Sequence, residues 1–184
     1  RGGEEILRLY EENIEFEVIP GITSAVSVLS YAGIPVTHRR IARSFHVFTG
    51  KNAEDLDVDW KSVATLKGTL VFLMGFGNLH HITLKLRENG MEADRPCAVI
   101  MRGTTAKQRK VVGTLENIAE KARNEGLQAP CIIVIGDVVN FHRQFAWYEK
   151  KPLFGKNICI TRSKEQSGQL RERLLDLGAE VTEI

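Results

Sequence analysis

Three short glycine-containing stretches follow apolar runs and have residue types that can hold a flat or charged ligand. They lie at residues 20–24, 74–77 and 102–105. Because glycine has no Cβ, a ligand can approach the backbone closely there, and the first stretch adds the hydroxyls of Thr23 and Ser24 at an expected helix start. The spacing matches neither a P-loop nor a dinucleotide fingerprint. A single such turn is usually only a turn, but three in one short chain favour a ligand site.

Two arginines, Arg39 and Arg40, close the segment that Thr23 and Ser24 begin. Guanidinium groups bind carboxylates and phosphates in bidentate geometry, so the pair favours an anionic ligand, although a solvated surface pair is the commoner outcome. The stretch at residues 18–40 therefore offers a polar helix start at one end and an anion-binding pair at the other.

The remaining reactive residue types form no recognisable catalytic set. His80 and His81 are adjacent on an expected helix, and adjacent helical residues do not face one metal. Cys97, Cys131 and Cys159 have the spacing of neither a zinc site nor a disulfide framework, and each lies in or beside an apolar run. We therefore expect buried, reduced thiols and no metal. Covalent and metal catalysis are not indicated.

Composition and charge limit the class of protein. The 184 residues include 43% hydrophobic and 26% charged side chains, which is typical of a globular protein. A formal charge of +2 gives no general nucleic-acid surface but allows a locally basic pocket. No apolar run approaches the roughly 20 residues that span a bilayer, and no signal-peptide pattern is present. We expect a cytoplasmic protein without membrane or nucleic-acid partners.

Apolar strand-like runs alternate with helical patterns through residue 150. Strands are expected at residues 16–19, 44–49, 68–74, 97–101, 111–114 and 131–135. Helices are expected at residues 4–12, 23–31, 60–66, 79–88 and 115–124. The acidic stretch 50–59 and the basic run 107–110 are expected to face water. The alternation predicts an α/β domain, in which ligands bind beyond the carboxyl ends of the strands.

Composition changes again at residues 148–156, a charged linker that contains a proline. Beyond it the sequence predicts a strand at 157–161, a helix at 164–177 and a strand at 181–184, which together form one βαβ unit. The expected organisation is one domain at residues 1–150, followed at 151–184 by a linker and the truncated start of a second. Both ends look cut, so we expect a piece of a longer protein.

Six segments, in order, resemble uroporphyrinogen-III C-methyltransferases of the tetrapyrrole methylase family. They are Arg-Gly-Gly-Glu-Glu at 1–5, Pro-Gly-Ile-Thr-Ser at 20–24, Tyr-Ala-Gly-Ile-Pro-Val-Thr-His-Arg at 31–39, Leu-Val-Phe-Leu-Met-Gly at 70–75, Arg-Gly-Thr-Thr-Ala-Lys-Gln-Arg at 102–109 and Val-Ile-Gly-Asp-Val-Val at 134–139. Residues 155–167 are similar to the opening of uroporphyrinogen-III synthase, which some bacteria fuse behind the methyltransferase. The resemblance implies the C-terminal subdomain of the methylase fold, a mixed sheet with flanking helices, plus a partial βαβ unit.

The resemblance implies methyl transfer from S-adenosylmethionine, twice, to ring carbons of uroporphyrinogen III, giving precorrin-2 on the route to sirohaem and cobalamin. A sulfonium is already electrophilic and a reduced pyrrole carbon nucleophilic, so alignment can supply much of the acceleration. The residues that would contact the methyl donor are Thr23, Ser24, Met74 and Gly103. Those that would face the macrocycle are Arg1, Glu4 and Arg39. Among these, Arg39 would meet carboxylates and Arg1 would assist loss of the ring proton, and a homodimer is expected.

Two alternatives stay open. One is another methylase of the superfamily, acting on a later corrin intermediate, a protein or ribosomal RNA. The other is a non-catalytic ligand-binding domain. The family's amino-terminal domain carries two glycine-rich loops that line the donor crevice, and neither precedes Arg1 in this sequence. We therefore expect the chain alone to bind the donor weakly, to have negligible activity and to self-associate through an uncovered apolar face.

Overall fold

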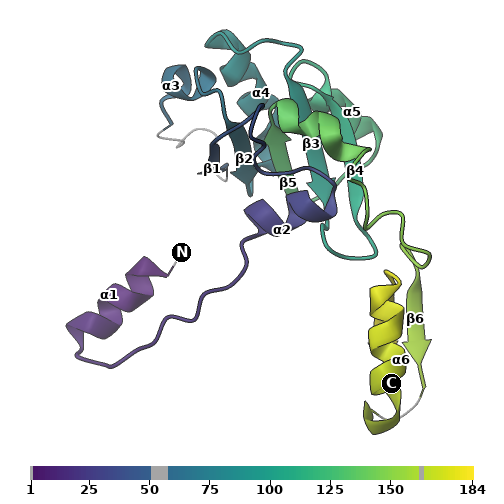
Figure 1. The fold of residues 1–184 in the computed structure, drawn as a ribbon. Helices are drawn as coiled ribbons and strands as arrows, with labels where there is room; N and C mark the ends of the chain where they lie inside the picture. Colours follow the sequence, from purple (N-terminus) through teal and green to yellow (C-terminus); the bar gives the residue numbers. More distant parts are fainter. Residues whose placement is uncertain (1, 51–57, 162–163) are drawn as a thin grey trace.

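The structure is a computed structural model that describes residues 2–50, 58–161 and 164–184, with only the backbone for residues 164–167. Its centre is a five-stranded sheet with the order β1-β2-β5-β3-β4 (Figure 1). The strands are β1 (Phe45–Thr49), β2 (Thr69–Leu73), β3 (Pro96–Met101), β4 (Arg109–Thr114) and β5 (Cys131–Ile135). β1 pairs with β2 in parallel, and every other neighbouring pair is antiparallel. The predicted mixed sheet is confirmed.

Helices cover both faces of this sheet because its central strands are apolar on both sides. They are α2 (Ser24–Tyr31), α3 (Trp60–Ala64), α4 (Leu79–Glu88) and α5 (Ile118–Asn124), with short 3-10 helices η1 (Phe76–Asn78) and η2 (Asp137–His142). Successive strand residues point to opposite faces, so Phe72 and Ile133 join a core with α3, α4 and α5. Val71 and Val134 join a second core under α2 and η2. All five residues of β5 are buried, as expected of a strand covered on both faces.

The amino-terminal segment lies apart from the sheet. Figure 1 shows α1 (Gly3–Glu11) joined to α2 by a long extended tether, and no residue of α1 is buried. The strand predicted at residues 16–19 is wrong, because no strand forms there and Ile19 is 86% exposed. An extended segment becomes a strand only when a neighbouring edge takes up its backbone hydrogen bonds, and no described strand lies beside this one.

Other predicted boundaries and exposures need correction. α5 begins at Ile118 rather than at residue 115, because the Leu115 and Glu116 N–H groups donate to the carbonyls of Arg95 and Ala93. Most of the predicted loop at 50–59 falls on residues 51–57, which are outside the described residues. The prediction that residues 107–110 face water is wrong in part, because a buried polar network takes up the side chains of residues 108 and 110.

The carboxyl-terminal segment contains the predicted strand, helix and strand as β6 (Asn157–Ile160), α6 (Lys164–Asp176) and β7 (Glu180–Glu183). β6 and β7 pair in parallel in a two-stranded sheet, which extends away from the five-stranded sheet (Figure 1). Cys97 and Cys131 are buried as predicted, but Cys159, on β6, is exposed. No helix in the described ranges is long and apolar enough to cross a bilayer.

Candidate ligand site at the strand ends

A cavity of about 1040 Å³ opens where β2 and β3 end and β5 begins. These strand ends share one edge of the sheet because β5 is antiparallel to both neighbours, which places Leu73 beside Ile132 and Met101 beside Cys131. All three glycine-containing stretches of the sequence reach this cavity. Their lining residues are Ser24, Met74, Phe76, Gly77, Arg102, Gly103 and Thr105. The fold therefore brings the three stretches, from Ser24 to Thr105, together at one site.

The start of α2 forms one side of the cavity. Thr23 is the N-cap residue, and its hydroxyl accepts a hydrogen bond of 3.3 Å from the Ala25 N–H. Capping satisfies one of the free N–H groups at the helix start, so this hydroxyl has a structural role. Ser24 follows and lines the cavity. Of the two hydroxyl residues, Ser24 is thus the one placed on the cavity surface.

The loop after β3 forms the adjoining part of the wall. Arg102 and Thr104 have φ values of +47° and +70°, a left-handed conformation that side chains rarely adopt. Between them Gly103 packs against α2, and a Cβ there would lie 2.3 Å from Val28 Cγ1. The Arg102 N–H donates to the Pro130 carbonyl (3.1 Å), which ties the loop to the start of β5. Such strained backbone persists only where neighbours hold it in place.

Met74 lies on the rim in the same left-handed conformation, with φ +55° and a side chain that is 56% exposed. The backbone around it is closely packed, because a Cβ on Gly50 would lie 2.6 Å from Gly75 Cα and a Cβ on Gly75 would lie 3.0 Å from Ile82 Cδ1. The Gly50 N–H donates to the Leu73 carbonyl (2.7 Å), and Asn78 Nδ2 donates to the Gly50 carbonyl (2.7 Å). These contacts hold the methionine out toward the cavity.

The cavity walls are mainly apolar, with cationic groups at Arg102 and Lys107 and a carboxylate at Glu180. Burial raises the pKa of the Cys131 thiol to about 11, and its Sγ donates to the Gln128 carbonyl (3.0 Å). The thiol is therefore neutral at physiological pH and is not a nucleophile. Among the described residues, no group of three His, Cys, Asp or Glu side chains could hold a metal ion. Apolar walls with accessible backbone suit a flat ring system that carries polar edges.

A separate basic hollow of about 470 Å³ contains Arg39, Arg40, Arg43 and Lys67. Arg43 Nε donates to the Arg39 carbonyl (3.3 Å), which fixes the turn. None of the four cations forms an ion pair within the part of the chain that the structure describes. Four cations around one hollow, none ion-paired with a described residue, favour an anionic ligand with several charges.

The basic hollow lies at the opposite edge of the sheet from the cavity, since Ser44 and Lys67 precede the starts of the parallel strands β1 and β2. The two ends of a five-residue strand are about 13 Å apart, at roughly 3.3 Å per residue, so the hollow and the cavity lie at least that far from each other. The structure thus brings together Ser24, Met74 and Gly103 but not Arg39. Glu4 lies on the detached α1 (Figure 1), and Arg1 lies outside the described residues.

Sequence reasoning missed several lining residues. They are Val28, Lys107, Ala129, Pro130, Cys131, Ile132 and Glu180. Those at 129–132 precede or begin a strand, whereas we looked for ligand contacts at the carboxyl ends of strands. The antiparallel pairing of β5 with β2 and β3 brings its start to the same edge.

Comparison with known proteins gives consistent matches. The family of Tetrapyrrole (Corrin/Porphyrin) Methylases matches residues 1–119. The porphyrin biosynthesis protein HemD of Ruminiclostridium josui is 46% identical over 100% of this chain and 37% of its own length. A uroporphyrinogen-III C-methyltransferase of Bacillus subtilis is 42% identical over 100% of this chain and 38% of its own length. The chain therefore spans less than two fifths of these two relatives.

Among solved structures, the chain is similar to the crystal structure of uroporphyrin-III C-methyl transferase from Thermus thermophilus complexed with S-adenyl homocysteine. The TM-score is 0.65 and the sequence identity 34%, and the match covers 76% of this chain and 61% of that one.

Proposed function

We propose that this chain, which belongs to the family of tetrapyrrole (corrin/porphyrin) methylases, forms part of an enzyme that methylates uroporphyrinogen III. The methyl donor is S-adenosylmethionine, and two transfers to ring carbons give precorrin-2, a precursor of sirohaem and cobalamin. One observation carries the proposal, namely the cavity that gathers Ser24, Met74 and Gly103 at one sheet edge. The similar Thermus thermophilus protein is described with S-adenyl homocysteine, the demethylated form of this donor.

The cavity residues fit this donor by their chemistry. S-adenosylmethionine supplies an electrophilic methyl group on its sulfonium. In the proposed site, Gly103 presents backbone to the flat part of the donor, Ser24 presents a hydroxyl and Met74 contacts it from the rim, with Thr23 holding the start of α2. Apolar walls exclude water around the reacting atoms, and alignment of the methyl with the ring carbon lowers the barrier. This chemistry needs no nucleophile from the protein.

The basic hollow supplies the proposed contacts to the acceptor. Uroporphyrinogen III carries eight carboxylates, which suit the cations around Arg39. Because the hollow and the cavity lie at opposite edges, Arg39 would bind substituents of the macrocycle rather than its reacting carbon. Glu4 and Arg1 are also proposed to face the macrocycle, with Arg1 assisting loss of the ring proton.

Replacing Arg39 with alanine is expected to raise the KM for uroporphyrinogen III roughly tenfold, since a hydrogen bond between charged groups contributes about 1.5–3 kcal/mol. The kcat should change little, because the residue lies away from the reacting atoms. Steady-state kinetics of the intact gene product, meaning the full protein that contains this chain, provide the measurement. Arg87→Ala on the exposed face of α4 is the control. A fall in kcat with KM unchanged would contradict this role.

We further propose that the domain boundary lies near residue 150 and that residues 151–184 begin a domain like uroporphyrinogen-III synthase. The separate two-stranded sheet of β6 and β7 supports a second unit. The relatives also support a second unit, because this chain covers only 37% and 38% of their lengths. Limited proteolysis that cuts first within residues 148–156 would support the boundary, and first cuts inside β5 would count against it.

We also propose a cytoplasmic homodimer. Large apolar side chains are exposed along α1 and its tether, including Tyr10 at 73% and Ile22 at 86%. Exposed apolar surface of this extent favours association. Light scattering on this chain is expected to give a mass above that of the monomer, rising with concentration. A constant monomer mass across a wide concentration range would contradict self-association.

The proposed function is tested by incubating the intact gene product with uroporphyrinogen III and S-adenosylmethionine labelled in the methyl group. We expect two labelled methyl groups per macrocycle. Transfer only to a later corrin intermediate, a protein or ribosomal RNA would show instead that the protein is another methylase of the superfamily. Donor binding without any transfer would favour the non-catalytic domain.

A further inference from the structure

A buried polar network lies behind the cavity and joins its Gly103 loop to the start of the linker. Lys110 Nζ donates to Glu149 Oε2 (2.9 Å) and to the Ala32 carbonyl (2.7 Å). The side chain of Lys110 is only 9% exposed and that of Glu149 25%. Gln108 is buried beside them, and its Nε2 donates to Glu149 Oε1 (3.0 Å) and to the Tyr31 carbonyl (3.3 Å).

Glu149 and the Tyr31 carbonyl together determine which way the Gln108 amide faces. The Glu149 carboxylate, which is ion-paired with Lys110, and the Tyr31 carbonyl both accept hydrogen bonds, so the NH₂ of Gln108 must point toward them. The amide oxygen then points the other way, where it accepts from the Thr104 N–H (2.9 Å). Thr104 is the residue after Gly103 and has a φ of +70°. The carboxylate thus acts on the left-handed loop through one intervening side chain.

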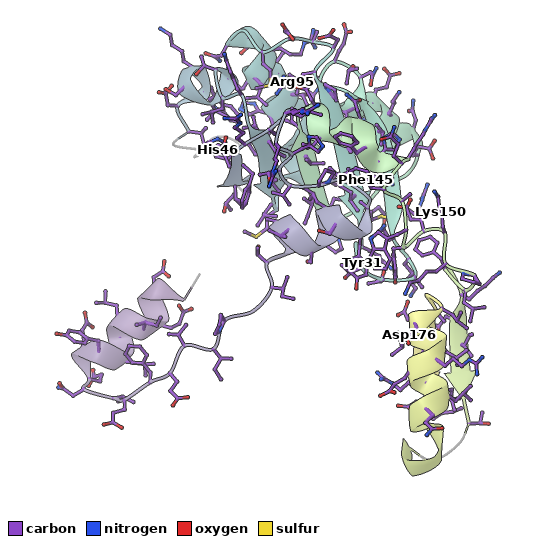
Figure 2. All side chains as sticks on the ribbon, in the orientation of Figure 1. Tyr31, His46, Arg95, Phe145, Lys150 and Asp176 are labelled. Carbon is purple, nitrogen blue, oxygen red and sulfur yellow. The ribbon has the colours of Figure 1, made fainter. Side chains whose placement is uncertain are left out.

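The adjacent Tyr148 holds the other polar group of Thr104. Its hydroxyl donates to the Thr104 carbonyl (3.3 Å), and its ring packs edge-on against Tyr31 with centroids 4.7 Å apart. Burial raises the pKa of Tyr148, with smaller contributions from Tyr31 and Glu180, so the hydroxyl stays protonated as a donor. Figure 2 shows Tyr31 at the end of α2 and Lys150 on the neighbouring linker.

We propose that Glu149, acting through Gln108, is a positioning residue that holds the Gly103 loop in the conformation that binds the methyl donor. The inference rests on the proposed function, because it assigns the cavity to S-adenosylmethionine. Both backbone polar groups of Thr104 are held by linker residues, one directly and one through Gln108. A residue next to the proposed domain boundary therefore acts on the donor site.

The test measures S-adenosylhomocysteine binding by calorimetry on the intact gene product, together with its melting temperature. Glu149→Ala removes the nearer of the two acceptors of the Gln108 NH₂ and is expected to weaken binding roughly tenfold, the effect of about one lost hydrogen bond in the loop. Glu149→Gln keeps one acceptor oxygen and should give an intermediate dissociation constant. Gln108→Met removes the contact with Thr104 while leaving Glu149 intact, and should match Glu149→Ala in its effect on binding.

Asp137→Ala is the matched control, because Asp137 forms an ion pair with Arg95 (3.2 Å) at the other edge of the sheet. It should leave the dissociation constant unchanged even where it lowers the melting temperature. If Glu149→Gln and Gln108→Met fold and bind S-adenosylhomocysteine as tightly as the wild type, the positioning role is overturned. If the wild type itself neither binds this ligand nor transfers a methyl group, the proposed function fails instead.

Discussion

Replacing Gly103 with alanine is expected to slow methyl transfer by the intact gene product about a hundredfold, the effect of moving bound groups by roughly 1 Å. The new Cβ would lie 2.3 Å from Val28 Cγ1 and 2.9 Å from Val28 Cβ, well inside contact distance. Valine is branched at Cβ and cannot rotate away freely, so the loop must move. Kinetics under single-turnover conditions and S-adenosylhomocysteine calorimetry provide the measurement.

Gly168→Ala is the control for the Gly103 change, because nothing lies within 4 Å of a Cβ built at this α6 position. Adding Val28→Ala to Gly103→Ala should recover part of the lost rate, since it removes the two nearest atoms of the clash. Wild-type binding and turnover by Gly103→Ala would show that the donor does not depend on this loop.

Replacing Phe72 with alanine is expected to lower the free energy of unfolding by about 3–5 kcal/mol. Phe72 is fully buried in β2, an interior strand of the sheet, and its ring stacks on Phe48 with centroids 5.1 Å apart. The substitution would leave a cavity in the core under α3 and α4. Urea unfolding of this chain, followed by circular dichroism, measures the change.

The matched control is Phe45→Ala, which removes the same side chain from the edge strand β1, where it is 42% exposed. A loss below about 1 kcal/mol is expected there. Equal losses for the two variants would mean that β2 does not form the centre of the core.

The sequence predicted the central strands well because a continuous apolar run such as that of β5 needs no knowledge of its neighbours. The run at residues 16–19 is apolar except for Glu17 but has no partner strand among the described residues, so its local pattern was misleading. Strand formation there depends on what lies beside the segment, which periodicity along the chain does not contain.

The site was predicted in part for the same physical reason. Glycines that follow strands indicated the stretches at 74–77 and 102–105, and a helix-capping signal indicated the stretch at 20–24, because these signals are local, whereas the individual donor contacts were implied by the resemblance. The separation of Arg39 from the cavity depends on strand direction and sheet order, which are non-local. Lys110 was expected to face water because its partner, Glu149, follows 39 residues later. Only the folded chain brings these two charges together.

We propose that the cavity at the ends of β2 and β3 holds the methyl donor. A crystal structure of the intact gene product with S-adenosylhomocysteine would show where this ligand binds. We predict that the ligand lies against the backbone of Gly103, with Met74 and Ser24 in contact. A ligand bound elsewhere, with this cavity empty, would contradict the claim.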